Sequence, residues 1–131
     1  MAYEDGGHHD EQHCIEDRAG VVSHGRSPTL SPDIEWRVLE SFPSGGLYRG
    51  RQVVIDRFFP AVKAHFAAYE TRPETFMADG DTVIATGRYR VQGRSGIAAD
   101  VDFAHVWTVR DGVIVAFRQI ADTAALNAVL S

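Results

Sequence analysis

The sequence predicts an α+β domain in which a strongly bent antiparallel sheet packs on helices. Three observations predict it. Several stretches after residue 31 alternate apolar and polar residues, as half-buried strands do. One stretch instead repeats its apolar residues every four positions, as an amphipathic helix does. Glycine-containing turn signals separate the later strands and join them as hairpins.

Composition is typical of one globular domain. The chain has 131 residues, of which 44% are apolar and 24% charged. No apolar run approaches the ~20 residues that a membrane helix needs, and no secretory signal is visible. The single cysteine, Cys14, excludes an internal disulfide and fits a reducing compartment, and the net charge of -5 offers no basic footprint for nucleic acid. We therefore expect a cytoplasmic protein with no membrane or nucleic-acid partner.

The first 30 residues differ from the rest. They carry six acids against two bases and only nine apolar residues, whereas residues 31–131 contain 49 apolar residues. This predicts a poorly structured acidic segment over 1–30 and a folded domain over 31–131. The segment includes a histidine-rich tract, made of His8, His9, His13 and Cys14. Such a tract binds a divalent metal weakly at most, and its spacing matches no structural zinc site, so we expect no metal.

The folded region begins with a strand and a helix. The strand is predicted by the alternation of Ile34, Trp36 and Val38 with charged residues. A loop over 43–46 follows, and a helix is then predicted from Arg51 onward by the apolar stripe of Val54, Phe58, Val62 and Phe66. Pro60 lies inside that stripe without an amide hydrogen, which predicts a kink or two short helices meeting at Phe59–Pro60.

Next come an edge-like strand and a hairpin. The extended segment over 69–78 contains Pro73, as edge or irregular strands do. A tight turn at 78–81 leads into a strand over 83–91. One face of this strand presents Val83, Ala85, Gly87, Tyr89 and Val91. The other face presents Ile84, Thr86, Arg88 and Arg90.

A further hairpin and a short helix complete the chain. The strand over 101–109 presents on one face Val101, Phe103, His105, Trp107 and Val109. A turn at Asp111-Gly112 leads into the last strand, over 113–120. Asp122 then provides an N-cap for an apolar C-terminal helix.

Five blocks of this sequence resemble the SnoaL-like branch of the NTF2-like superfamily. They are Ser31–Trp36, Tyr48–Arg51, Ala78–Asp81, Phe103–Gly112 and Phe117–Thr123, in the order and spacing of the family. The resemblance implies a cone, in which a curved antiparallel or mixed sheet wraps around helices as an α+β barrel, with a pocket at one end. It also implies a homodimer formed through the outer face of the sheet. Family members begin with a long amphipathic helix, which is expected to be absent or degenerate here.

The resemblance points to His105 as a candidate catalytic residue. This position is similar to the one where ketosteroid isomerases hold a protonated acid that donates to the substrate oxyanion. An imidazole can donate such a hydrogen bond or shuttle a proton. Alternatively, His105 packs between Phe103 and Trp107 without a ligand. Asp122 is the second catalytic candidate, because it is the acid near the end of the last strand; alternatively, it only caps the following helix.

A ligand pocket is expected from eight residues: Trp36, Tyr48, Phe59, Arg88, Phe103, Trp107, Phe117 and Gln119. The aromatic members, with Phe58, either line a pocket or form the core. The position of Gln119 is similar to the one where polyketide cyclases of the family carry an acid/base aspartate. The amide of Gln119 can orient a ligand carbonyl, but it cannot take a proton. Arg88 resembles the arginine of the Arg-x-Asp element of epoxide hydrolases, although Arg90 replaces the acid.

The resemblance implies that the chain binds a small hydrophobic molecule and uses no cofactor. An enzyme of this kind would catalyse isomerisation, cyclisation or hydration at the carbonyl or epoxide of a hydrophobic compound, with His105 moving a proton. The alternative is a non-catalytic ligand-binding or dimerisation module. A non-catalytic module predicts that His105 packs without a cavity beside it and that no acid reaches the pocket.

Overall fold

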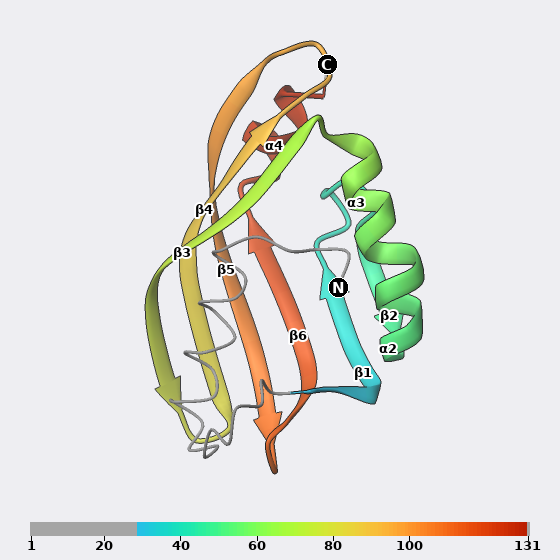
Figure 1. Ribbon diagram of the computed structural model, residues 1–131. Coiled ribbons are helices and arrows are strands. Elements are labelled where there is room, and N and C mark those ends of the chain that lie inside the picture. The colour runs from blue at the N-terminus through green and yellow to red at the C-terminus, as the bar shows by residue number, and fades with distance from the viewer. Residues whose placement is uncertain (1–28, 131) are drawn as a thin grey trace.

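A bent six-stranded sheet dominates the computed structural model, which describes residues 29–130 (Figure 1). Its strands are β1 (Thr29–Val38), β2 (Gly46–Arg49), β3 (Ala68–Asp79), β4 (Thr82–Gln92), β5 (Ala98–Arg110) and β6 (Val113–Ala121). Their order is β2-β1-β6-β5-β4-β3, with β1 and β6 parallel and the other neighbours antiparallel. The predicted α+β fold with a curved, mixed sheet is confirmed. The sheet stays open, with β2 and β3 as its edges, and so does not close into a barrel.

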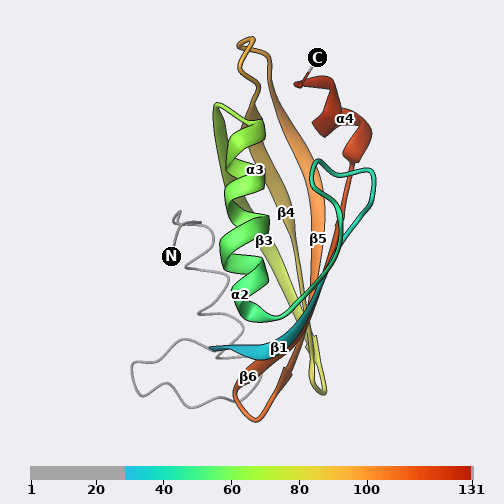
Figure 2. The ribbon, with the colours of Figure 1, turned by 90° about the vertical axis from the view of Figure 1, so that its right-hand side faces the viewer.

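A helix in three consecutive segments covers the concave face of the sheet (Figure 2). The segments are α2 (Arg51–Val53), the π-helical turn η1 (Val54–Phe58) and α3 (Phe59–His65). Pro60 lies in the first turn of α3, one residue after the π turn. The irregularity predicted at Phe59–Pro60 is therefore a wider turn just before the proline, within a continuous helix.

The core lies between this helix and the inward-facing residues of the strands. On β5 the inward residues are those predicted from the alternation, and all of them are buried: Val101, Phe103, His105, Trp107 and Val109. Trp36 on β1 of the same sheet packs against Trp107 of this row, and Phe58 and Phe59 on the helix pack against Trp36. The site described below is thus part of the core.

β3 is the irregular edge strand that its proline predicted. Its pairing with β4 shifts register between Pro73 and Thr75, directly across from Gly87. A Cβ atom added to Gly87 would lie 2.1 Å from the carbonyl oxygen of Arg72 and 2.8 Å from Cα of Pro73. The close approach of the two backbones therefore requires glycine at this position.

The chain ends in α4 (Thr123–Ala128), which packs on β5 and buries Leu126. None of the helices in the described part of the chain is long and apolar enough to cross a membrane. The predictions of an unstructured acidic segment, a missing first helix and a metal-free histidine tract concern residues 1–30. They lie outside the described residues, apart from Thr29 and Leu30 at the start of β1.

We predict that Gly87→Ala lowers the free energy of unfolding by about 1–3 kcal/mol, because the added methyl group forces the β3 and β4 backbones apart. Urea unfolding followed by fluorescence measures the change. Arg90→Ala on the solvent face of the same strand, where an exposed pair with Asp100 is lost, is the control and should cost less than about 0.5 kcal/mol. Equal effects of the two substitutions would contradict the proposed role of Gly87.

Candidate functional site

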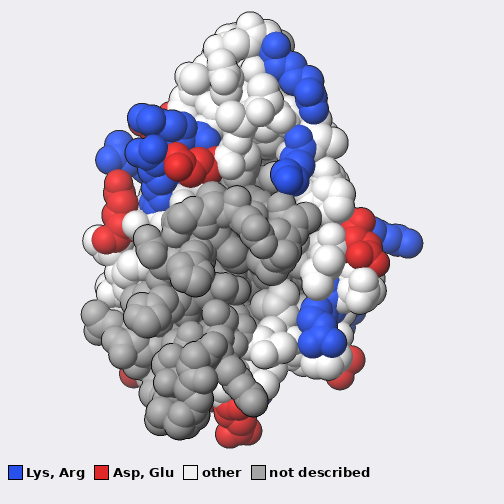
Figure 3. All heavy atoms as spheres, viewed as in Figure 1, with Lys and Arg blue, Asp and Glu red and all other residues white. Residues whose placement is uncertain are grey.

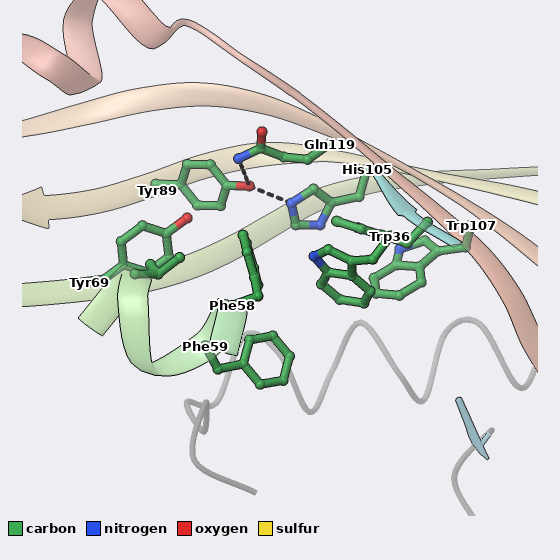
Figure 4. Close-up of a pocket in the computed structure, with 10 residues that line it drawn as sticks. Trp36, Phe58, Phe59, Tyr69, Tyr89, His105, Trp107 and Gln119 are labelled. Carbon is green, nitrogen blue, oxygen red and sulfur yellow. Dashed lines mark hydrogen bonds between the residues drawn. The ribbon is translucent and has the colours of Figure 1, made fainter. Parts of the chain in front are cut away.

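A small cavity lies between the helix and the concave face of the sheet (Figure 4). It is partly open to solvent and has about 30 Å³ of free volume, enough for about two water molecules. Its lining comes from the helix and from five of the six strands: Trp36, Phe58, Phe59, Val62, Tyr69, Tyr89, His105, Trp107, Phe117 and Gln119. The wall is therefore mostly aromatic, with a few polar groups.

Strand register brings these side chains together in two neighbouring rows. In one row Trp36 is opposite Phe117, and Phe117 is opposite Trp107. In the next row Gln119 is opposite His105. Because residues two apart on a strand share a face, the aromatic row and the polar row border the same cavity.

The polar row is completed by Tyr89, whose hydroxyl lies 2.5 Å from Nε2 of His105 (Figure 4). The same hydroxyl oxygen accepts a hydrogen bond of 3.2 Å from Nε2 of Gln119. The imidazole tautomer sets which of the two groups donates in the bond between Tyr89 and His105. All three residues are buried, with 6% of His105 and 2% of Gln119 exposed. They form a hydrogen-bonded group inside an apolar core, which we call the polar trio.

Two buried polar atoms of the described side chains have no hydrogen-bond partner: Nε1 of Trp36 and Oε1 of Gln119. Both residues line the cavity. The indole N–H is a donor and the amide oxygen an acceptor, so the wall offers one unused group of each kind. Buried polar groups in native proteins are nearly always paired, and such exceptions point to a bound water or ligand.

Six of the predicted site residues line this cavity: Trp36, Phe59, His105, Trp107, Phe117 and Gln119. Two others lie one layer behind it. Phe103 stacks on His105 with ring centroids 4.2 Å apart, and Tyr48 packs on Phe58 at 5.2 Å. The Tyr48 hydroxyl donates to the backbone carbonyl of Ser44. Phe103 and Tyr48 therefore hold lining residues in place.

Arg88 does not lie in the cavity, which corrects the prediction made from the epoxide-hydrolase resemblance. It points to the outer face of β4, where its guanidinium donates to Glu74 at 3.1 Å. The hydrogen bond and the charge of that carboxylate raise the pKa of Arg88. The reason is strand alternation: Tyr89 faces the core, so its neighbour faces solvent. Figure 3 shows basic and acidic side chains together at this side of the molecule.

Asp122 also lies outside the cavity, and it takes the second of its two predicted roles. Its carboxylate accepts a hydrogen bond of 3.2 Å from the backbone N–H of Ala125, as the N-cap of α4. The side chain is exposed at the end of β6. Asp122 is thus a capping residue, and the structure does not support its predicted catalytic role.

Sequence reasoning missed three lining residues: Val62, Tyr69 and Tyr89. Tyr89 is the important omission, because it holds the polar trio together. A signal was present: on the inward face of β4, Tyr89 follows the small residues Ala85 and Gly87. Ala85 is opposite His105 in the sheet, which leaves room over the imidazole for a long side chain from further along the strand.

The lining contains no carboxylate, and the described residues contain no cluster of histidine, cysteine and acidic side chains suited to a metal. The groups available for chemistry are thus an imidazole, a phenol, an amide and an indole N–H. They can donate and accept hydrogen bonds, and His105 with Tyr89 can move a proton.

Comparison with known proteins identifies relatives of this chain. The family model of the SnoaL-like domain matches residues 25–117. An NTF2-like protein from Burkholderia thailandensis is 28% identical, with a TM-score of 0.76 and coverage of 92% of this chain and 97% of that one. An NTF2-like protein of unknown function from Burkholderia pseudomallei is 25% identical, with a TM-score of 0.73 and coverage of 95% and 88%. TerC, co-crystallized with polyporic acid, is 28% identical, with a TM-score of 0.74 and coverage of 95% and 92%. None of the curated proteins matches the sequence.

We predict that Tyr89→Phe lowers the free energy of unfolding by about 1–3 kcal/mol, because it leaves polar groups of His105 and Gln119 buried without their partner. Combining it with Gln119→Leu should cost less than the sum of the two single changes, since the double variant leaves fewer unpaired groups. Urea unfolding of all four proteins measures the coupling.

The matched control combines Tyr89→Phe with Tyr48→Phe, whose hydroxyl bonds to Ser44 instead. The free energies of that pair should add. A cycle with Gln119→Leu that is equally additive would show that the polar trio does not act as a unit.

Proposed function

This chain belongs to the SnoaL-like family of NTF2-like proteins, and on that premise we propose that it binds a small hydrophobic compound carrying a carbonyl or epoxide oxygen. The observation that carries the proposal is the aromatic cavity bordered by the polar trio. Apolar pockets with a few fixed polar groups are typical of small-molecule sites, because the rings supply affinity and the polar groups fix orientation.

Two further observations support a ligand. The cavity wall carries a donor and an acceptor without partners, which a bound molecule would satisfy. A solved relative that is 28% identical to this chain was co-crystallized with polyporic acid. The free volume of about 30 Å³ is less than a six-membered ring occupies, so the proposed ligand requires lining side chains to move apart.

Cofactor-free proton transfer within this ligand is the catalytic form of the proposal, and the contact between Tyr89 and His105 favours it. His105 would donate to the reacting oxygen or take a proton from the adjacent carbon, while Gln119 holds Tyr89 in place. Isomerisation, cyclisation and hydration all contain such a step. A binding protein without catalysis is the second candidate, and the lack of a lining carboxylate favours it.

We further propose a homodimer formed through the convex face of the sheet, with the protein located in the cytoplasm. That face carries Ile120, which is 40% exposed, beside the half-buried Ala104 and Val106. A hollow of about 190 Å³ lies across β1, β6 and β5 on the same face. A second copy of the chain would cover these apolar side chains.

We predict that native mass spectrometry of the purified protein reports a dimer with a bound compound of low mass. Val62→Phe fills the cavity from the helix and should remove the bound mass while the dimer remains. Met77→Phe makes a similar aromatic change on an exposed position of β3 and should keep the bound mass. A wild-type protein that retains no compound, and whose cavity fails to take up any added hydrophobic carbonyl or epoxide, would contradict the proposal.

We predict that His105→Ala slows conversion of the compound so identified by about a hundredfold or more, the usual contribution of a general acid or base. Arg88→Ala, on the outer face, is the control and should keep wild-type turnover. Product formation by the purified proteins is the measurement. Full turnover by the His105 variant would remove its catalytic assignment, and no turnover by the wild type would leave a binding protein.

A further inference from the structure

The indole N–H of Trp36 is a buried donor without an acceptor at the wall of the cavity. Only 4% of the residue is exposed, so bulk water does not serve as its partner. An indole nitrogen can only donate, and it has one proton. In Figure 4 this nitrogen faces the space between Phe58 and His105. The cavity therefore contains a fixed position at which an acceptor is required.

The neighbours of Trp36 do not supply that acceptor. Four aromatic rings surround it, with centroids between 4.0 and 6.0 Å away: Phe58, Phe59, Trp107 and Phe117. None of these side chains contains an oxygen. Among the side chains of residues 29–130, Oε1 of Gln119 is the other unpaired buried polar atom, and it does not bond to Trp36. The position of the indole is fixed by β1, which is held between β2 and β6.

The chemistry of these surroundings selects a kind of oxygen. A hydroxyl group or a water placed against the indole would accept its proton, but it would bring a proton of its own, for which Oε1 of Gln119 is the unpaired acceptor of the described lining. A carbonyl oxygen accepts without adding a donor. We infer that Trp36 is a specificity-determining residue that recognises a carbonyl oxygen attached to a flat ring, and so selects aryl or conjugated ketones over hydrocarbons of the same shape. This inference rests on the proposed function, which supplies a ligand in the cavity.

Acetophenone and α-methylstyrene test it, because they share one shape and differ only in C=O against C=CH₂. Trp36→Phe keeps a ring on β1 but removes the N–H. It should weaken acetophenone binding by about three- to tenfold, the usual net effect of one neutral hydrogen bond, while α-methylstyrene binding changes by less than about twofold. The matched control is Trp107→Phe, which removes the other cavity indole and should alter both affinities by the same factor.

The spectrum of the wild-type protein provides a readout that does not require Trp36 to be replaced. The chain has two tryptophans, so a ¹⁵N–¹H spectrum contains two indole N–H signals, and Trp107→Phe identifies that of Trp36. Acetophenone should move the Trp36 signal downfield and slow its exchange with solvent, whereas α-methylstyrene should do neither. This measurement tests whether Trp36 recognises the carbonyl oxygen even where Trp36→Phe fails to fold.

The outcomes separate this inference from the proposed function. If both compounds bind and Trp36→Phe reduces both affinities equally, or the Trp36 signal responds equally to both, the recognition role is wrong while ligand binding stands. If neither compound binds to the wild type at its solubility limit, the cavity does not admit these rings and the inference is wrong, while the proposed function is decided by the native mass spectrometry described above.

Discussion

The parallel pairing of β1 with β6 is the constraint on which the rest of the site depends. It places Trp36 opposite Phe117 and joins the first strand to the β3–β6 part of the sheet. Between Leu30 and Glu35 the pairing shifts, so β1 passes three more residues than β6 there before the register resumes. A slip of one residue would turn Trp36 outward and bring Glu35 into the core. The charged neighbours of Trp36 thus fix the register as firmly as Trp36 itself.

The polar trio shows how the core tolerates a histidine and a glutamine. Burying either without a hydrogen bond would cost free energy, and the Tyr89 hydroxyl reduces that cost by bonding to both. Phe103 stacks on both His105 and Tyr89, so the two rings are held in orientation as well as in contact. The exposed ion pairs of the outer face, such as Arg88 with Glu74, contribute little by comparison. The arrangement leaves Oε1 of Gln119 unpaired, which a core evolved for stability alone would have no reason to keep.

Residue periodicity predicted the strands and the inward face of β5, because alternation reflects burial directly. Periodicity also placed Arg88 and Tyr89 on opposite faces of their strand. It was a better guide than the family resemblance, which predicted Arg88 in the pocket. Tyr89 was missed because its hydroxyl reaches His105 along the sheet: Tyr89 is opposite Val101, whereas His105 is opposite Ala85. Such a diagonal contact depends on ring orientation, which periodicity does not encode. Pro60 predicted an irregularity in the helix but not its form as a π turn, because a proline disturbs a helix without fixing how the chain accommodates it.

The composition of the lining also bears on which chemistry the proposed enzyme would perform. If His105 took a proton from the ligand, the resulting imidazolium would lie among rings, with no lining carboxylate as counter-charge. The Tyr89 hydroxyl and the Gln119 amide are neutral, so they cannot compensate that charge by forming an ion pair. A proton held in this way is best returned promptly to the same molecule at another atom. Isomerisation meets that condition, because the proton that leaves one carbon is delivered to another. Hydration and epoxide opening instead require a water to be activated by a base, and a carboxylate would serve that role far better than this neutral group. The geometry therefore ranks isomerisation first among the reactions proposed for this cavity.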